Sequence, residues 1–145
     1  THLGPDTPLT NLDSFYYHAV CRKKTVYNNR YFGGLGILIK RAIKPYVKIL
    51  NSSIPDYQWI KLDKTYFELD ADLYICAVYY PPSGSTYTRG LEYDIFDLLE
   101  KDLSKYKPMG DILLCGDFNA RVGLQQDYIV EDDTYFVPVH KELSD

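Results

Sequence analysis

Residues 111–119 read Asp-Ile-Leu-Leu-Cys-Gly-Asp-Phe-Asn, an apolar run that ends in a carboxylate and a carboxamide one residue apart. The uninterrupted apolar residues 112–115 predict a strand covered on both faces, a central strand of an α/β domain. Gly116 would let the backbone turn or approach a ligand closely. Because side chains alternate along a strand, we expect Asp117 and Asn119 on one face and the intervening phenylalanine on the other.

The Asp117 and Asn119 pair has two interpretations on spacing alone. A carboxylate beside a neutral amide suits a general base and a donor to a developing oxyanion. The same residue types also turn the chain after a strand. The triplet is a weak motif by itself, so the surrounding sequence must decide between the two.

A strand–helix–strand unit precedes and includes this pair. Residues 73–80 form a second apolar strand that ends in a Pro-Pro-Ser-Gly turn, and apolar residues at helical spacing predict a helix over 91–106. A crossover helix makes the two strands parallel, so their carboxyl ends open on the same edge of the sheet, where α/β folds place ligand sites. Tyr79, Asp117 and Asn119 are therefore expected to meet.

Further segments rich in Tyr, Phe, Val and Ile, separated by Asn, Gly and Ser turns, predict successive antiparallel strands. These segments are residues 14–21, 32–40, 45–50, 57–69 and 73–80. Only one long helix is expected, so the sequence predicts a mixed α/β domain.

The charges are unevenly distributed along the chain. The net charge is −4, yet residues 14–55 contain no acidic residue. The basic residues of that segment are Arg22, Lys23, Lys24, Arg30, Lys40, Arg41, Lys44 and Lys48. Together with interleaved tyrosines, this segment could lie along a phosphate backbone without reading base sequence. It could equally be a solvated face that serves solubility.

The cysteines and the lengths of the apolar runs indicate the cellular compartment of the protein. The three cysteines, Cys21, Cys76 and Cys115, are odd in number and widely spaced, which favours small core residues with free thiols. No apolar run approaches the roughly 20 residues of a membrane span, and the first residues lack a targeting pattern. The sequence predicts an intracellular protein, in the nucleus or cytoplasm, with no membrane partner.

Three motifs resemble the endonuclease/exonuclease/phosphatase superfamily, and most of all the endonuclease domain of LINE-type (non-LTR) retrotransposons. They are Gly33-Gly34-Leu-Gly-Ile, Tyr79-Tyr80-Pro81-Pro82 and Gly116-Asp117-Phe118-Asn119, in that order. The resemblance implies a DNase I-like, four-layered α/β/β/α sandwich. It also implies that residues 1–145 are a single domain truncated at both ends, with a loop over 124–145.

The resemblance implies metal-assisted hydrolysis of a phosphodiester, with Mg²⁺ or Mn²⁺ as cofactor. Asp117 matches the aspartate that orients or deprotonates the attacking water, and Asn119 matches the asparagine that donates to a phosphate oxygen. Tyr79 matches the tyrosine whose hydroxyl contacts the same phosphate, while Tyr80 is expected to pack. Arg121 would reach a phosphate or form a salt bridge.

Two elements of the family pattern are not found in this chain. The metal-binding glutamate of the family would precede Thr1, so the metal ligands in this chain are unknown. The closing aspartate–histidine pair does not occur in residues 127–145, which are acidic and irregular. We therefore expect a fragment with an incomplete catalytic site that is inactive alone.

The residues and the resemblance are compatible with three functions. The first is nicking of DNA at a target site, with DNA as partner and a reverse transcriptase domain in the parent protein. The second is a phosphatase of the same superfamily that acts on an inositol phosphate or a lipid phosphoester. The third is a non-catalytic remnant that binds nucleic acid. The candidate DNA contacts are Lys23, Lys24, Lys40, Arg41 and Arg121.

Overall fold

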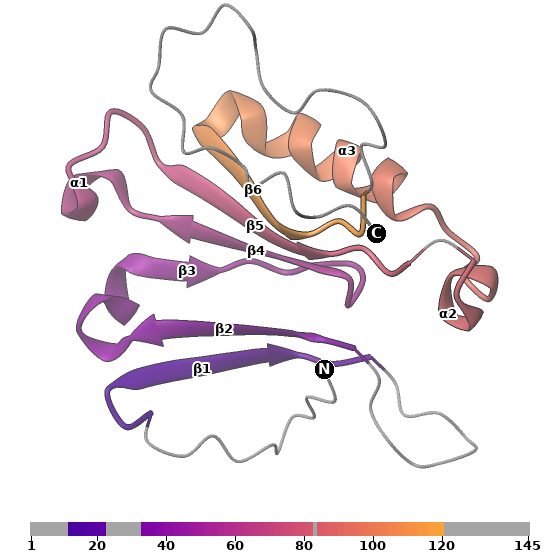
Figure 1. The fold of residues 1–145 in the computed structure, drawn as a ribbon. Helices are drawn as coiled ribbons and strands as arrows, with labels where there is room; N and C mark the ends of the chain where they lie inside the picture. Colours follow the sequence, from indigo (N-terminus) through magenta and orange to yellow (C-terminus); the bar gives the residue numbers. More distant parts are fainter. Residues whose placement is uncertain (1–11, 23–32, 83, 121–145) are drawn as a thin grey trace, which may run out of the picture.

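The structure, a computed structural model, describes residues 12–22, 33–82 and 84–120. The predicted loop over 124–145 lies outside the described residues. The elements in chain order are β1 (Phe15–Val20), β2 (Leu35–Lys40), the 3₁₀ helix η1 (Arg41–Tyr46), β3 (Val47–Ile49), β4 (Tyr57–Leu62), α1 (Lys64–Phe67), β5 (Leu73–Tyr79), α2 (Thr86–Arg89), α3 (Ile95–Tyr106), the 3₁₀ helix η2 (Lys107–Met109) and β6 (Asp111–Asp117) (Figure 1).

The described strands form two sheets. One has the order β3-β4-β5-β6, and the other is the β1-β2 pair. The β1/β2, β3/β4 and β4/β5 pairings are antiparallel, whereas β5 and β6 are parallel. The parallel pairing on either side of α3 confirms the predicted strand–helix–strand unit. None of the described helices is long and apolar enough to cross a membrane.

One strand ends earlier and one helix begins later than the sequence predicts, because an aspartate caps a helix N-terminus at each position. The strand predicted over 57–69 ends at Leu62, since the Asp63 side chain accepts hydrogen bonds from Thr65 N and Tyr66 N and begins α1. The predicted helix 91–106 begins only at Ile95, because the Asp94 carboxylate accepts a hydrogen bond from Phe96 N at 2.7 Å.

The prediction that residues 112–115 form a central, doubly covered strand is wrong. Among the described strands, β6 lies at the edge of its sheet. Ile112 and Leu114 pack against the hydrophobic core, but Leu113 is 46% exposed and Cys115 is exposed. An uninterrupted apolar run does not distinguish one covered face from two, so the burial of the second face could not be read from it.

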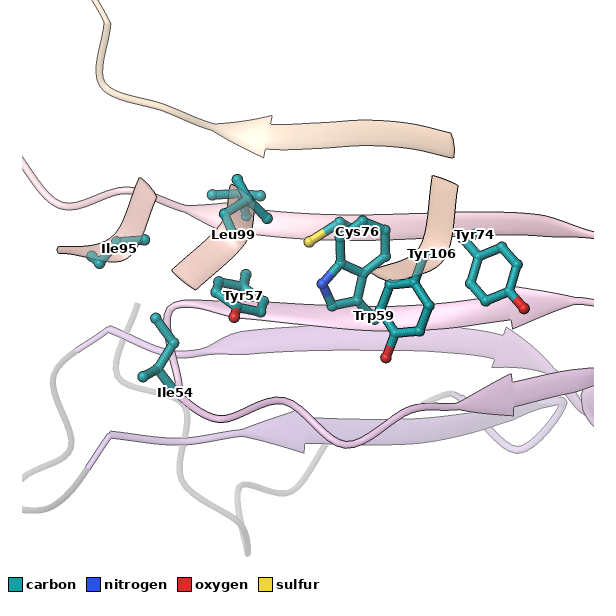
Figure 2. Close-up of a cluster of buried hydrophobic side chains, with 9 residues drawn as sticks. Ile54, Tyr57, Trp59, Tyr74, Cys76, Ile95, Leu99 and Tyr106 are labelled. Carbon is teal, nitrogen blue, oxygen red and sulfur yellow. The ribbon is translucent and has the colours of Figure 1, made fainter. Parts of the chain in front are cut away.

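The core lies between α3 and one face of the four-stranded sheet. Alternate residues of β4 and β5 point to this face, and Figure 2 shows them packed against the helix. The central members are Tyr57, Trp59, Tyr74, Cys76, Val78, Ile95, Leu99 and Tyr106. Burial of each large apolar side chain stabilises the fold by about 1.5–3 kcal/mol. The intervening β5 residues, Tyr79 among them, therefore point to the opposite face.

The β1-β2 pair lies on the side of the four-stranded sheet opposite to α3 (Figure 1). His18 of β1 contacts Gln58 of β4, with His18 Nε2 at 3.4 Å from Gln58 Oε1. Arg22, which follows β1, forms a buried salt bridge with Asp56, which precedes β4. These mixed sheets and helices are compatible with the predicted sandwich, while the complete four-layered arrangement stays a prediction.

Candidate active site at the carboxyl ends of β5 and β6

Tyr79 and Asp117 lie side by side at the carboxyl ends of the two parallel strands. They are Cα partners at the last position of the β5/β6 pairing. Tyr80 N donates a hydrogen bond to Asp117 O at 2.7 Å, so the strands stay paired to their ends. The structure thus brings these two predicted site residues together at one sheet edge, where β5 and β6 run side by side (Figure 1).

Gly116 allows the two strands to approach each other at this point. Its φ is +140°, and a Cβ atom there would lie 1.9 Å from Val78 O on β5. No side chain fits in that space. Glycine is therefore required by the neighbouring backbone, and the expected close approach to a ligand is instead an approach to β5.

Asn119 reaches the site through a turn rather than through strand alternation. β6 ends at Asp117, and Asn119 has a φ of +46°, a conformation that asparagine tolerates better than most residues. Asn119 N donates to Asp117 Oδ1 at 2.9 Å, and Asn119 Nδ2 donates to Tyr80 O at 2.7 Å. The expected shared strand face is thus replaced by a hydrogen-bonded turn that joins both strands.

The arrangement leaves reactive groups accessible. Asp117 and Asn119 are both exposed. One oxygen of the Asp117 carboxylate accepts the Asn119 N–H group, which fixes the orientation of the carboxylate. The Asn119 amide carries two hydrogens, and its bond to Tyr80 O uses one of them. The site can thus present a base and a hydrogen-bond donor to one small ligand.

Tyr79 and Tyr80 point to opposite sides, as expected for neighbours on a strand. Tyr80 stacks on Phe96 of α3, with ring centroids 4.6 Å apart, and packs against the core. Tyr79 is half-buried, and the Arg22 guanidinium carbon lies over its ring, 5.1 Å from the centroid. This agrees with the expected packing role of Tyr80.

A buried polar cluster around Asp56 lies next to Tyr79, and sequence reasoning missed it. Asp56 is 0% exposed. Its Oδ1 accepts hydrogen bonds from Arg22 Nε (3.0 Å) and Nη2, and its Oδ2 accepts from the hydroxyls of Tyr87 (2.8 Å) and Tyr93 (3.3 Å). The Asp56 carbonyl oxygen also accepts from Tyr79 N at 2.8 Å.

The tyrosines of this cluster are held in their neutral form. Burial raises the pKa of Tyr87, and its hydrogen bond with Asp56 raises it further. Burial likewise raises the pKa of Tyr93. Both hydroxyls therefore act as donors to the Asp56 carboxylate. In the sequence, Asp56 is the first acidic residue after a long acid-free segment, which is the one signal that marks it.

The described basic candidates lie at the other end of the β1-β2 pair. Lys40 pairs with Phe15 at the start of β1, whereas Arg22 follows the far end of that strand. An open groove of about 810 Å³ lies beside this end; its lining residues are Tyr16, His18, Arg41, Lys44, Pro45, Val47, Lys48 and Ile49. The candidates Lys23, Lys24 and Arg121 lie outside the described residues.

Arg41 and Lys44 at this groove contact a backbone carbonyl oxygen and an aromatic ring, respectively. Arg41 Nε donates to Asp13 O at 2.7 Å, and Lys44 Nζ lies 4.8 Å from the centre of the Tyr16 ring. Neither of the salt bridges among the described residues involves a basic residue of the groove. Their charges are therefore not neutralised by a carboxylate in the described part of the chain, unlike the charge of Arg22.

The described residues do not by themselves assemble a metal site. Within the described ranges, no three His, Cys, Asp or Glu side chains form a group that could hold a metal ion. Asp117 supplies the hard oxygen ligand that Mg²⁺ prefers, but it is a single carboxylate. The described residues therefore supply one metal ligand and not a complete metal site.

Comparison with known proteins assigns the family. The family model described as endonuclease/exonuclease/phosphatase matches residues 1–130. A search of curated proteins and a search of solved structures each found no match. The matched residues include both sheets, the cluster around Asp56 and the Tyr79, Asp117 and Asn119 site. The chain belongs to the endonuclease/exonuclease/phosphatase family.

Proposed function

We propose that this chain is part of a nicking endonuclease that hydrolyses DNA phosphodiesters for a retrotransposon of the LINE type. Membership in the family indicates a nuclease or phosphatase hydrolase, and members of the family generally depend on a divalent metal. The single observation that carries the proposal is the meeting of Tyr79, Asp117 and Asn119 at one sheet edge. The choice of DNA rests on the motif resemblance and on the basic groove.

The residues are assigned roles from their chemistry and position. The exposed Asp117 carboxylate accepts a proton from, or orients, the attacking water, because a neutral water is a poor nucleophile. The remaining amide hydrogen of Asn119 donates to a phosphate oxygen as negative charge develops on it. The Tyr79 hydroxyl donates to the same phosphate. Each role needs the fixed strand pairing described above.

A polymeric substrate fits the charge distribution better than a small phosphoester. The exposed Lys40 and Arg41 lie at the end of the β1-β2 pair remote from Tyr79, and the exposed Lys48 lines the groove beside that end. A small phosphoester bound at Tyr79 would not reach them, whereas a nucleic-acid backbone spans such a distance with several phosphates. The proposed product is a 3′-hydroxyl end that a reverse transcriptase domain of the parent protein would use as primer.

A supercoiled-plasmid nicking assay tests this function. The assay is run with Mg²⁺, with Mn²⁺ and with EDTA, on the 145-residue chain and, where the gene continues beyond it, on a longer version. We expect nicking by the longer version alone, and we expect EDTA and Asp117→Ala both to abolish it. Lys61→Met is the matched control, since Lys61 forms an ion pair at the other end of β4.

The other outcomes would replace the proposal. Release of phosphate from an inositol phosphate or a lipid phosphoester, without plasmid nicking, would assign the chain to the phosphatases of the family. DNA binding with no hydrolysis of either substrate, by any version of the chain, would identify a non-catalytic binding domain.

A further inference from the structure

The guanidinium of Arg22 lies between the proposed catalytic tyrosine and a buried carboxylate. Its central carbon is 5.1 Å from the centre of the Tyr79 ring and 3.8 Å from the centre of the Tyr87 ring. Its Nε and Nη2 donate to Asp56 Oδ1. We propose that Arg22, locked by Asp56, is a positioning residue that fixes the ring of Tyr79 for its contact with the phosphate. This inference rests on the function proposed above.

Several contacts leave Arg22 only one position. The residue is 7% exposed, and Asp56, which holds it, is completely buried. Asp56 is fixed in turn by the hydroxyls of Tyr87 and Tyr93. On another side, a Cβ atom at Gly33 would lie 2.6 Å from Arg22 Nη1, so the guanidinium occupies the space that a side chain would take. A buried cation with this many partners has little rotational freedom.

The same cluster holds both the backbone and the ring of Tyr79. The Asp56 carbonyl oxygen accepts the Tyr79 N–H group at 2.8 Å, beyond the end of the regular β4/β5 pairing. The guanidinium covers the ring face, a contact that favours a cation over an aromatic ring. The two residues of one ion pair therefore hold Tyr79, one through its backbone and the other through its ring, and so direct its hydroxyl toward the position where the phosphate is proposed to bind.

The net charge of the Arg22–Asp56 pair distinguishes positioning of Tyr79 from electrostatic attraction of DNA. Arg22 and Asp56 carry opposite charges in direct contact, so the pair adds almost no net charge to the surface. Arg22 is thus not equivalent to the exposed basic residues of the groove. Its replacement is expected to change the rate of the chemical step rather than the affinity for DNA, because misplacement of a contacting group by about 1 Å can cost about a hundredfold in rate.

A double-mutant cycle on plasmid nicking by the longer version tests the proposal. Arg22→Lys is expected to lower kcat by about tenfold to a hundredfold with little change in KM. In the Tyr79→Phe background, where the hydroxyl is already absent, the same substitution is expected to have almost no further effect. Lys61→Met, which breaks the half-buried ion pair with Asp72, is the matched control and leaves nicking unchanged.

A milder variant guards against loss of folding. Tyr87→Phe removes one hydrogen bond to Asp56 and keeps the ring that stacks on Arg22. It is expected to lower kcat by a smaller factor than Arg22→Lys does. In the Tyr79→Phe background it is expected to have almost no effect. Circular dichroism of each variant shows whether the fold is retained.

Three results would overturn the inference. Equal loss of activity by Arg22→Lys in both backgrounds would show a general structural role. If Tyr79→Phe nicks DNA at the wild-type rate, the hydroxyl that Arg22 is proposed to position has no role in the reaction. If that nicking still requires Asp117, the endonuclease assignment remains intact. If no nicking occurs, NMR of ¹³C-labelled tyrosine decides: a Tyr79 signal equally ordered in wild type and Arg22→Lys would contradict positioning, and selective broadening in Arg22→Lys would support it.

Discussion

Tyr79 and Asp117 face each other as Cα partners at the last position of the parallel β5/β6 ladder. The hydrogen bonds from Tyr80 N to Asp117 O and from Asn119 Nδ2 to Tyr80 O close this end of the sheet. The separation of the two side chains is thus set by strand pairing and not by a loop. Changes in either strand end are therefore expected to affect the whole site.

In the longer version, Asp117→Asn is expected to lower the nicking rate by about 10²–10⁴-fold, because the amide cannot accept a proton from water. The side chain keeps its size, and Asn119 N can still donate to its oxygen, so folding should be retained. Plasmid nicking and DNA binding by fluorescence anisotropy measure the two properties separately. A nicking rate equal to that of the unmodified chain would refute the assigned role.

Asn119→Gly and Asn119→Ala separate the chemical role of Asn119 from its backbone role. Both variants lose the amide donor, so both are expected to nick DNA about 10²–10³-fold more slowly. Only alanine is strained at a φ of +46°, so Asn119→Ala should be less stable than Asn119→Gly by about 1–2 kcal/mol. Urea unfolding measures the difference, and equal stabilities would show that the turn relaxes.

Gly116→Ala is expected to separate β6 from β5, since the new Cβ would lie 1.9 Å from Val78 O. We expect a loss of about 1–3 kcal/mol in unfolding free energy, together with loss of nicking. Gly84→Ala is the matched control. Gly84 also has a positive φ, but a Cβ there meets no atom within 4 Å. If both variants are equally stable, the close strand contact is not required.

The two ion pairs of the described residues should differ greatly in their contribution to stability. Arg22→Met leaves the Asp56 carboxylate buried without its cation, which is expected to cost about 3–5 kcal/mol. Lys61→Met breaks a pair whose side chains are 27% and 24% exposed, so we expect a cost of about 0–1 kcal/mol. Urea unfolding of both variants at neutral pH checks the contrast.

The contribution of the Lys61–Asp72 ion pair to stability should also depend on pH. The hydrogen bond from Lys61 lowers the pKa of Asp72, so the pair stabilises the fold above the unfolded-state pKa of this carboxyl group. That stabilisation is lost as the pH falls through the lowered folded-state pKa. The difference between Lys61→Met and the unmodified chain should therefore disappear in acid. A difference that persists there would assign the effect to packing of the lysine side chain.

Charge reversal at the basic groove should weaken DNA binding and flatten its dependence on salt. Each lost phosphate contact reduces the slope of log affinity against log salt concentration by about 0.9. The exposed positions to change to glutamate are Lys40, Arg41 and Lys48. The matched controls, exposed on and just after α3, are Lys101, Lys105 and Lys107. An equal effect of both sets would indicate a response to net charge alone.

The strand–helix–strand unit was predictable because its signals are local. Helical spacing gives α3, and a helix between two apolar strands implies parallel pairing, which places Tyr79 beside Asp117. The position of β6 at the edge among the described strands was not predictable, because an apolar run carries no information on how many faces are covered. The prediction that Asn119 shares a strand face with Asp117 was wrong for a related reason. Alternation of side chains holds only while the strand continues, and β6 ends at Asp117.

The cluster around Asp56 was missed because it depends on contacts between distant residues. Arg22 and Asp56 are 34 positions apart, and no spacing rule tells which carboxylate meets which cation. Among the basic residues of its segment, Arg22 looked like part of a nucleic-acid surface. The fold instead turns it inward, beneath Tyr79.

The exposure of one face of β6 provides a place to attach a probe. Cys115 lies on that face two residues before Asp117, so strand alternation directs both side chains the same way. Cys76 is completely buried, and burial raises the pKa of its thiol, which makes it inert to thiol reagents. With Cys21 changed to serine, a fluorophore could be coupled to Cys115 alone. Its emission would then report the arrival and departure of a ligand at the neighbouring carboxylate in real time.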